Sequence, residues 1–209
     1  MYRNRNGLLL VVSGPSGVGK GTVCKALLER LETMRISISA TTRPRRVNEI
    51  DGVNYFFKTQ EEFETMIEHG EFLEYMQVFG LNYYGTPKAY VEEERRNGHD
   101  ILLEIDVKGA MKVKEVCSDA VTVFIAPPTM SDLKTRLYGR GTENEAAIER
   151  RYKEAFAEIQ YLPKYDYVVV NDIVDRAAKN ICDIIEAEKS SIKRNSELIA
   201  KYSEEMNEQ

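Results

Sequence analysis

Apolar residues recur along the chain in two alternating patterns, short uninterrupted runs and helix-like spacing. The uninterrupted runs predict buried strands over 8–12, 101–106, 121–126 and 167–170. Helix-like spacing predicts helices over 20–31, 107–116, 130–137 and 145–161, and one long helix after residue 172. Strands that alternate with helices favour an α/β fold, a parallel sheet covered on both faces with ligands at the carboxyl ends of its strands.

The segment 40–95 interrupts this alternation with short strands of its own. It follows a short alternating strand at 36–39, and it predicts strands over 55–57 and 71–79 and a tyrosine-rich turn over 80–85. Thr59 and Glu62 form a capping-box pattern before one helix, and Pro87 opens a second that ends near residue 97. We therefore expect a single domain, residues 1–209, with a core over 1–39, 96–129 and 162–209, an inserted lobe over 40–95, and a helical lid over 130–161.

The first strand runs into a glycine-rich turn and then into a helix, the arrangement of a phosphate-binding loop. Glycines let successive backbone N–H groups point at an anion, and Lys20 at the helix start adds a charge for the outer phosphates. Gly21 stands where a hydroxyl residue usually meets Mg2+, and Thr22 follows it. The expected nucleotide-binding residues are Gly14, Pro15, Ser16, Gly17, Val18, Gly19, Lys20, Gly21 and Thr22.

Composition narrows the class of protein and its partners. The chain of 209 residues is 43% hydrophobic and 30% charged, which is typical of a soluble globular protein. Its longest apolar runs fall well short of the roughly 18 residues that a membrane span needs, so we expect no membrane partner. A net charge of −5 argues against general nucleic-acid binding. Three widely spaced cysteines suit reduced thiols in a cytoplasmic protein.

Polar groups cluster in four further places that a parallel sheet could bring to one crevice. They are the basic segment 40–46, the tyrosine-rich 82–85, the carboxylates that end the strand at 103–106, and the arginines of the helical hairpin. A cradle for one polyphosphate beside arginines for a second anion suggests phosphoryl transfer between two bound molecules. Such a reaction depends on positioning and charge neutralisation rather than on a covalent nucleophile.

Taken in order and spacing, these segments resemble the guanylate kinases from residue 8 to about residue 188. The motifs are GPSGVGKGT, ISATTRPRR with DGVNYFF, EFLEY, NYYGTP, LEID, RLYGRGTE and DYVVVND. The TTR, DG and YFF block with NYYGT downstream is the most specific, because other nucleoside monophosphate kinases lack it. The resemblance implies a P-loop kinase with a parallel-sheet core, a small GMP-binding lobe and a lid, and a reaction in which ATP phosphorylates GMP or dGMP.

The resemblance also implies roles for residues in the lobe and at the strand end. Two arginines and two tyrosines would hold the GMP phosphate, and these are Arg43, Arg46, Tyr55 and Tyr84. The guanine base would be recognised by Glu74, Ser39, Thr86 and Glu104. Glu74 would accept from the guanine N1–H and exocyclic amine and would mismatch adenine, so this set can discriminate strongly between bases.

The same resemblance implies which residues bind ATP and its metal ion. Asp106 would lie near Mg2+, directly or through water, and Asn171 near the adenine. The lid arginines Arg136, Arg140 and Arg151 would close over ATP and, with Lys20 and Arg43, stabilise charge on the transferring group.

Three positions depart from the family pattern, and two other interpretations stay open. Asn48 replaces a small residue, Lys108 stands where glutamine is frequent, and Arg45 adds a charge beside Arg46, so that either arginine could be the second phosphate ligand. One alternative is a binding module of this fold that has lost catalysis. The other is a kinase for AMP or a pyrimidine monophosphate, which Glu74 and Thr86 argue against. The sequence leaves the oligomeric state open and is compatible with a homodimer.

Overall fold

The computed structural model describes residues 6–78, 81–139 and 145–207 and contains two sheets. The larger is a five-stranded sheet in which every pairing is parallel. Its strand order is β2 (Met34–Ile36), β7 (Asp100–Glu104), β1 (Leu9–Ser13), β8 (Val121–Ala126) and β9 (Tyr167–Val170). The predicted parallel α/β core is confirmed.

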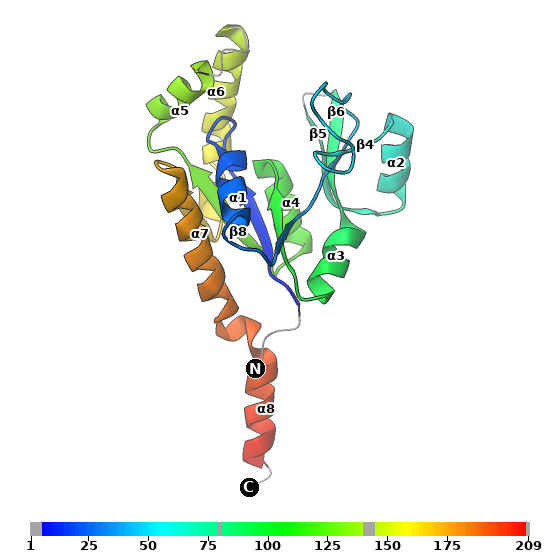
Figure 1. The fold of residues 1–209 in the computed structure, drawn as a ribbon, viewed down its shortest axis with the longest axis vertical. Coiled ribbons are helices and arrows are strands. Elements are labelled where there is room, and N and C mark those ends of the chain that lie inside the picture. Colours follow the sequence, from blue (N-terminus) through cyan, green and yellow to red (C-terminus); the bar gives the residue numbers. More distant parts are fainter. Residues whose placement is uncertain (1–5, 79–80, 140–144, 208–209) are drawn as a thin grey trace.

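Helices cover both faces of this sheet (Figure 1). Leu10 and Val12 of β1 point to one face, where they belong to an apolar cluster with residues of α1 (Lys20–Leu28) and α7 (Val174–Lys189). Leu9 and Val11 point to the other face and belong to a second cluster with residues of α3 (Lys88–Arg96) and α4 (Val107–Val116). Because both faces are buried, the strand carries no polar alternation, which explains its continuous apolar run.

The second sheet forms the lobe, together with helix α2 (Gln60–Glu68). Its order is β4 (Phe56–Phe57), β3 (Ala40–Thr41), β6 (Asn82–Pro87) and β5 (Phe72–Val78). The capping box at the start of α2 is confirmed, since Thr59 and Glu62 exchange hydrogen bonds. The predicted tyrosine-rich turn over 80–85 is wrong for residues 82–85, because Asn82–Pro87 is a strand that pairs with both β3 and β5, whereas residue 81 is in a turn.

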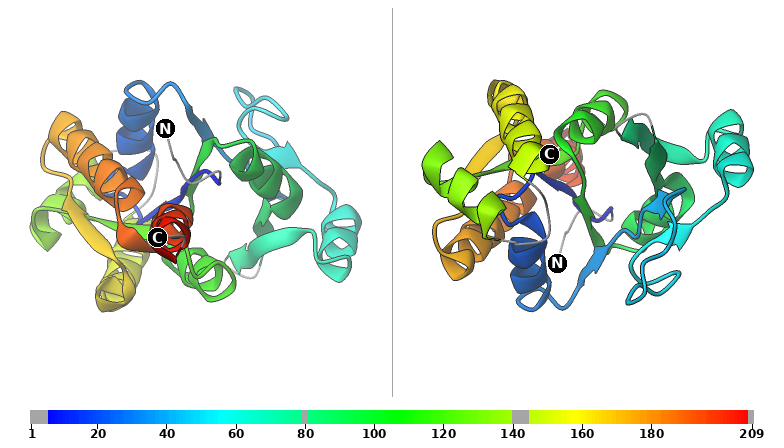
Figure 2. Two further views of the ribbon diagram at one scale, coloured as in Figure 1. Left: turned by 90° about the horizontal axis from the view of Figure 1, so that it is seen from below. Right: turned by 90° about the horizontal axis from the view of Figure 1, so that it is seen from above.

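Two helices stand over the carboxyl end of the core sheet, opposite the lobe. They are α5 (Met130–Tyr138) and α6 (Glu145–Ile159), followed by the 3-10 turn η1 (Leu162–Lys164). The view from above shows these helices and the lobe on opposite sides of the molecule, with the core between them (Figure 2). We call α5 and α6 the lid.

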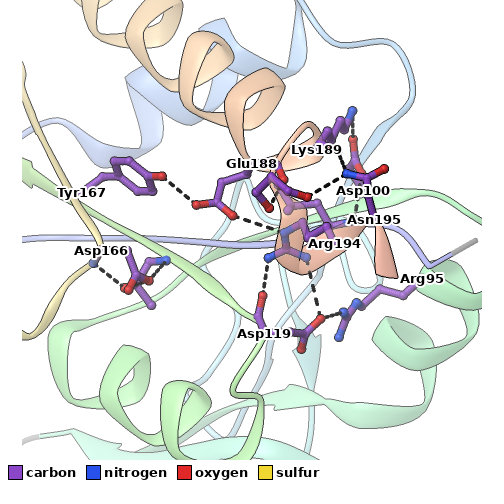
Figure 3. Close-up of polar contacts among 12 residues, drawn as sticks. Arg95, Asp100, Asp119, Asp166, Tyr167, Glu188, Lys189, Arg194 and Asn195 are labelled. Carbon is purple, nitrogen blue, oxygen red and sulfur yellow. Dashed lines mark hydrogen bonds and ion pairs between the residues drawn. The ribbon is translucent and has the colours of Figure 1, made fainter. Parts of the chain in front are cut away.

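The predicted single C-terminal helix is wrong, because it is divided in two. Helix α7 ends at Lys189, a 3-10 turn η2 (Ile192–Arg194) follows, and α8 (Ser196–Asn207) projects from the body (Figure 1). Asn195 donates to the carbonyls of Lys189 and Ser191, and Arg194 binds Glu188 and the carbonyl of Asp119 (Figure 3). Among the residues described, no helix is long and apolar enough to cross a membrane.

Candidate active site

A cleft of about 990 Å3 lies between the phosphate loop, the lobe and the lid. Its lining contains ten of the residues expected from sequence, namely Ser16, Lys20, Ser39, Arg46, Tyr55, Glu74, Tyr84, Glu104, Asp106 and Arg151. Gly17, Gly19, Gly21 and Thr22 line an adjoining pocket of about 600 Å3 that shares Ser16, Lys20, Tyr55 and Glu104 with the cleft. The fold therefore brings segments far apart in sequence to one cavity.

The phosphate loop is pre-shaped by its backbone. Gly19 has a φ of 96° and directly precedes α1, which begins at Lys20. The Lys20 ammonium folds back over the loop and donates to the carbonyls of Gly14 at 2.7 Å and Pro15 at 3.3 Å. Burial lowers the pKa of Lys20, while the nearby carboxylates of Glu158, Glu104 and Asp106 oppose that lowering. The loop thus holds its cation in place before any phosphate arrives.

Arg46, Tyr55 and Tyr84 line the lobe end of the cleft, and Arg43 lies beside Tyr55 without being part of that lining. Arg43 donates to Glu49 at 2.7 Å and lies 5.4 Å from the centre of the Tyr55 ring. Glu49 also accepts from the backbone N–H of Arg46, and Tyr55 meets Tyr84 edge to face. Burial raises the pKa of the Tyr55 hydroxyl above its ordinary value. Arg46, rather than Arg45, belongs to the cleft lining.

Glu74 is the most deeply buried carboxylate of the lobe side, with 6% of its surface exposed. Thr86, its partner across the β5–β6 pairing, donates to it at 2.7 Å. Burial raises the pKa of Glu74 to about 7, against the lowering effect of the Thr86 hydrogen bond. An ionised carboxylate only accepts hydrogen bonds, so a buried one suits a ligand that presents N–H donors.

Asp106 lies next to Glu74. It caps α4 by accepting from the backbone N–H of Gly109 at 2.7 Å. A side-chain carbon at Gly109 would come within 2.9 Å of Glu74 Oε2 and 3.3 Å of Asp106 Oδ1, so both carboxylates face this glycine.

Glu104 lies instead against the phosphate loop. A side-chain carbon at Gly21 would be 3.3 Å from Glu104 Oε1, so this carboxylate faces the position where a hydroxyl residue is usual. Burial raises the pKa of Glu104, and the Lys20 charge opposes that rise. We expected Glu104 near the base and Asp106 near the metal. In the structure Glu104 faces Gly21 and Asp106 lies beside Glu74, and both carboxylates are close enough to Lys20 to act on its pKa.

The two lid arginines that the structure describes, Arg151 and Arg136, make different contacts with the phosphate loop. Arg151 donates to the Ser16 hydroxyl of the phosphate loop at 2.7 Å. Arg136 donates to the carbonyls of Val18 and Asn171 and is not part of the cleft lining. Asn171 is buried and donates to Val18 as well, so both residues brace the loop from behind. Arg140 lies outside the described residues.

Arg150, Glu158 and Glu49 belong to the site and were missed in the sequence. Arg150 and Glu158 line the cleft on the lid side, and Glu49 accepts from Arg43. The spacing of Arg150 from Ala147 and Glu154, three and four residues away, places all three on one face of α6, and this signal could have identified it.

The residues present fit a magnesium ion that arrives with a nucleotide. Within the described residues, no group of three or more acidic, histidine or cysteine side chains could hold a metal ion. Mg2+ in kinase sites is bound by one or two carboxylates together with substrate phosphates and waters, and Glu104 and Asp106 supply such carboxylates in the cleft.

The parallel sheet, the glycine loop that opens a helix at Lys20 and the second cluster of arginines define a P-loop nucleotide kinase. The sequence model of the family described as guanylate kinase matches residues 6–188. The chain belongs to the guanylate kinase family.

Relatives of known name and a solved structure agree with this assignment. The chain is 52% identical to the guanylate kinase of Caldanaerobacter subterraneus subsp. tengcongensis, covering 98% of this chain and 99% of the relative. It is 52% identical to that of Clostridioides difficile, covering 97% and 98%. The crystal structure of guanylate kinase from Anaplasma phagocytophilum superposes with a TM-score of 0.78 at 35% identity, covering 95% of this chain and 94% of that one.

Proposed function

We propose that the enzyme transfers the terminal phosphoryl group of ATP directly to the phosphate of GMP or dGMP, which yields ADP and GDP or dGDP. The observation that carries this proposal is the single cleft that joins the Lys20 loop to Arg46, Tyr55 and Tyr84. Two anion sites that face one cavity hold donor and acceptor phosphates close together, and such positioning is the main requirement for phosphoryl transfer.

In this proposal, the lobe binds GMP. Arg43, Arg46, Tyr55 and Tyr84 hold its phosphate, with Glu49 fixing the direction of the Arg43 guanidinium. The ionised Glu74 accepts from guanine N1–H and the exocyclic amine. The three other base contacts come from Ser39, Thr86 and Asp106, which lies beside Glu74.

The phosphate loop binds ATP through residues 14–22. Lys20 leaves the carbonyls of Gly14 and Pro15 for the outer phosphates, and Arg151 and Arg150 approach the same phosphates from the lid. Mg2+ neutralises phosphate charge when it is bound. Glu104 is the carboxylate best placed to hold that ion or its waters, because it faces the loop at Gly21.

We place the enzyme in the cytoplasm with small nucleotides as its partners. Cys24, Cys117 and Cys182 are free thiols, which suits a reducing compartment. The net charge of −5 does not favour nucleic acid as a partner.

A coupled assay of ADP formation with ATP, Mg2+ and GMP, dGMP, AMP, UMP or TMP tests the proposal. We expect turnover with the guanine nucleotides alone and loss of that preference in Glu74→Ala. Turnover with AMP or a pyrimidine nucleotide at a comparable rate would contradict the assignment of the base site. GMP binding without turnover would instead indicate a binding module.

A further inference from the structure

One face of the lid helix α6 reaches into the phosphate loop. Arg151 and Glu158 lie seven residues apart, about two helical turns, and both contact Ser16. Arg151 donates to the Ser16 hydroxyl at 2.7 Å, whereas Glu158 Oε2 accepts from the Ser16 backbone N–H at 3.3 Å. The lid therefore approaches the loop with a cation and an anion together.

The groups that Glu158 approaches are the donors that a phosphate would use. Backbone N–H groups of a phosphate loop and its lysine are the ligands of a bound polyphosphate. Glu158 accepts from one such N–H, and among the carboxylates around Lys20 it has the strongest electrostatic effect on that lysine. The carboxylate of Glu158 thus takes a loop N–H that a phosphate oxygen could otherwise accept from.

This arrangement also has an electrostatic reason. Burying an ammonium group without a nearby negative charge is unfavourable in free energy. Glu158, which lines the same cleft as Lys20 on the lid side, supplies such a charge. When a polyphosphate arrives, it takes over the same donors, and two anions cannot share them without repulsion. Binding therefore requires the carboxylate to leave, and since Glu158 is part of α6, its departure couples phosphate binding to the position of the lid.

We propose that Glu158 is an internal competitor of ATP, a lid carboxylate that accepts from the Ser16 N–H of the phosphate loop and must be displaced by the nucleotide's phosphates. The inference rests on the ATP site proposed above. It makes Glu158 a positioning residue that weakens ATP binding without touching GMP.

Glu158→Gln tests this in the full chain. Glutamine keeps an oxygen acceptor for the Ser16 N–H but removes the charge that competes with phosphate. We expect the Kd for Mg2+-ATP, measured by titration calorimetry without GMP, to fall about tenfold, the scale of one hydrogen bond to a charged group. The Kd for GMP should change less than twofold, and in steady state the KM for ATP should fall more than kcat changes.

Glu154→Gln is the matched control. It removes the same charge from α6 one helical turn before Glu158. Among the described residues, Glu154 has no hydrogen bond with Ser16 and is not one of the carboxylates whose charge acts on Lys20, so we expect its Kd for Mg2+-ATP to stay within twofold of wild type. Glu158→Ala provides a second variant, because it removes acceptor and charge together and should also bind ATP more tightly than wild type. Thermal midpoints of all variants establish that each is folded.

Three results would overturn the inference. The first is an unchanged affinity for ATP in Glu158→Gln. The second is a lower affinity in that variant, as expected if the carboxylate served Mg2+. The third is an equal rise of affinity in Glu154→Gln, as expected from general charge repulsion. ADP formation by the wild-type enzyme with GMP is measured separately. If the wild-type enzyme formed no ADP, the proposed function would be contradicted. The ATP affinities of the variants would still test the role of Glu158.

Discussion

Glu74, the residue proposed to recognise the base, should also affect the pH dependence of the protein's stability. Its carboxyl is buried, and burial raises its pKa from an ordinary 4.5 to about 7. Since the unfolded chain releases this proton near pH 4.5 and the native state only near pH 7, the native state binds more protons between these values. Its free energy of unfolding therefore falls as pH rises through this window, and the whole loss is present above about pH 7.

The change Glu74→Gln isolates this effect because glutamine retains an acceptor for Thr86 but cannot ionise. Each pKa unit corresponds to about 1.4 kcal/mol, so a rise from 4.5 to about 7 costs the wild-type protein about 3 kcal/mol at pH 8. At pH 5, where the native carboxyl is still protonated, the cost is below about 1 kcal/mol. We expect the variant to be more stable than wild type by these amounts.

Urea unfolding of the nucleotide-free protein at pH 5, 6, 7 and 8 measures the difference. Glu68→Gln, which removes an exposed carboxylate from the same lobe, should show no comparable gain. If Glu74→Gln is no more stable than wild type at pH 8, then the folded protein compensates the charge of Glu74 and the reasoning is refuted. The same variant should bind GMP at least about 100-fold more weakly, because two hydrogen bonds to a charged acceptor are lost.

Three further changes test other parts of the molecule. Lys20→Met should lower kcat by about 100- to 1,000-fold in the coupled assay, because a charge on the transferring group is lost. Gly109→Ala should weaken GMP binding in calorimetry and leave ATP binding unchanged, since its methyl group would press on Glu74 and Asp106. Arg194→Ala should make α8 more sensitive to trypsin without changing turnover, because the variant loses the contacts with Glu188 and Asp119 that fix this helix.

Local signals in the sequence predicted the elements that local interactions stabilise. Thr59 and Glu62 satisfy each other's backbone groups within one helical turn, so their spacing alone identified the start of α2. The phosphate loop is equally local, and α1 begins at Lys20 as expected. Asn82 and Gly85 misled the prediction because turn residues also occur in strands, and here the pairing of β6 with β5 and β3 outweighs their preference.

The roles of residues whose partners lie far away in the sequence could not be predicted from the spacing of residues along the chain. Glu104 and Asp106 are two residues apart, yet they have different neighbours, because β7 ends at Glu104 and Asp106 already caps α4. Glu104 faces Gly21, and Asp106 lies beside Glu74. Arg136 was expected over ATP, but carbonyls of Val18 and Asn171 accept from it, and no local pattern reports such partners. The division of the C-terminal helix has the same origin, since Arg194 is bound by Asp119, 75 residues away.

A cleft that binds polyphosphates is lined here by several carboxylates, and the buried lysine explains why. Without phosphate, Lys20 is buried, and Glu158, Glu104 and Asp106 offset the unfavourable effect of that burial on its charge. When ATP arrives, the same carboxylates face a highly charged anion at close range, and they oppose its binding. A divalent cation bound with the nucleotide would offset much of that repulsion, and Glu104 and Asp106 are the carboxylates that would help to hold it. The acidic lining thus favours metal-bound ATP over the free nucleotide.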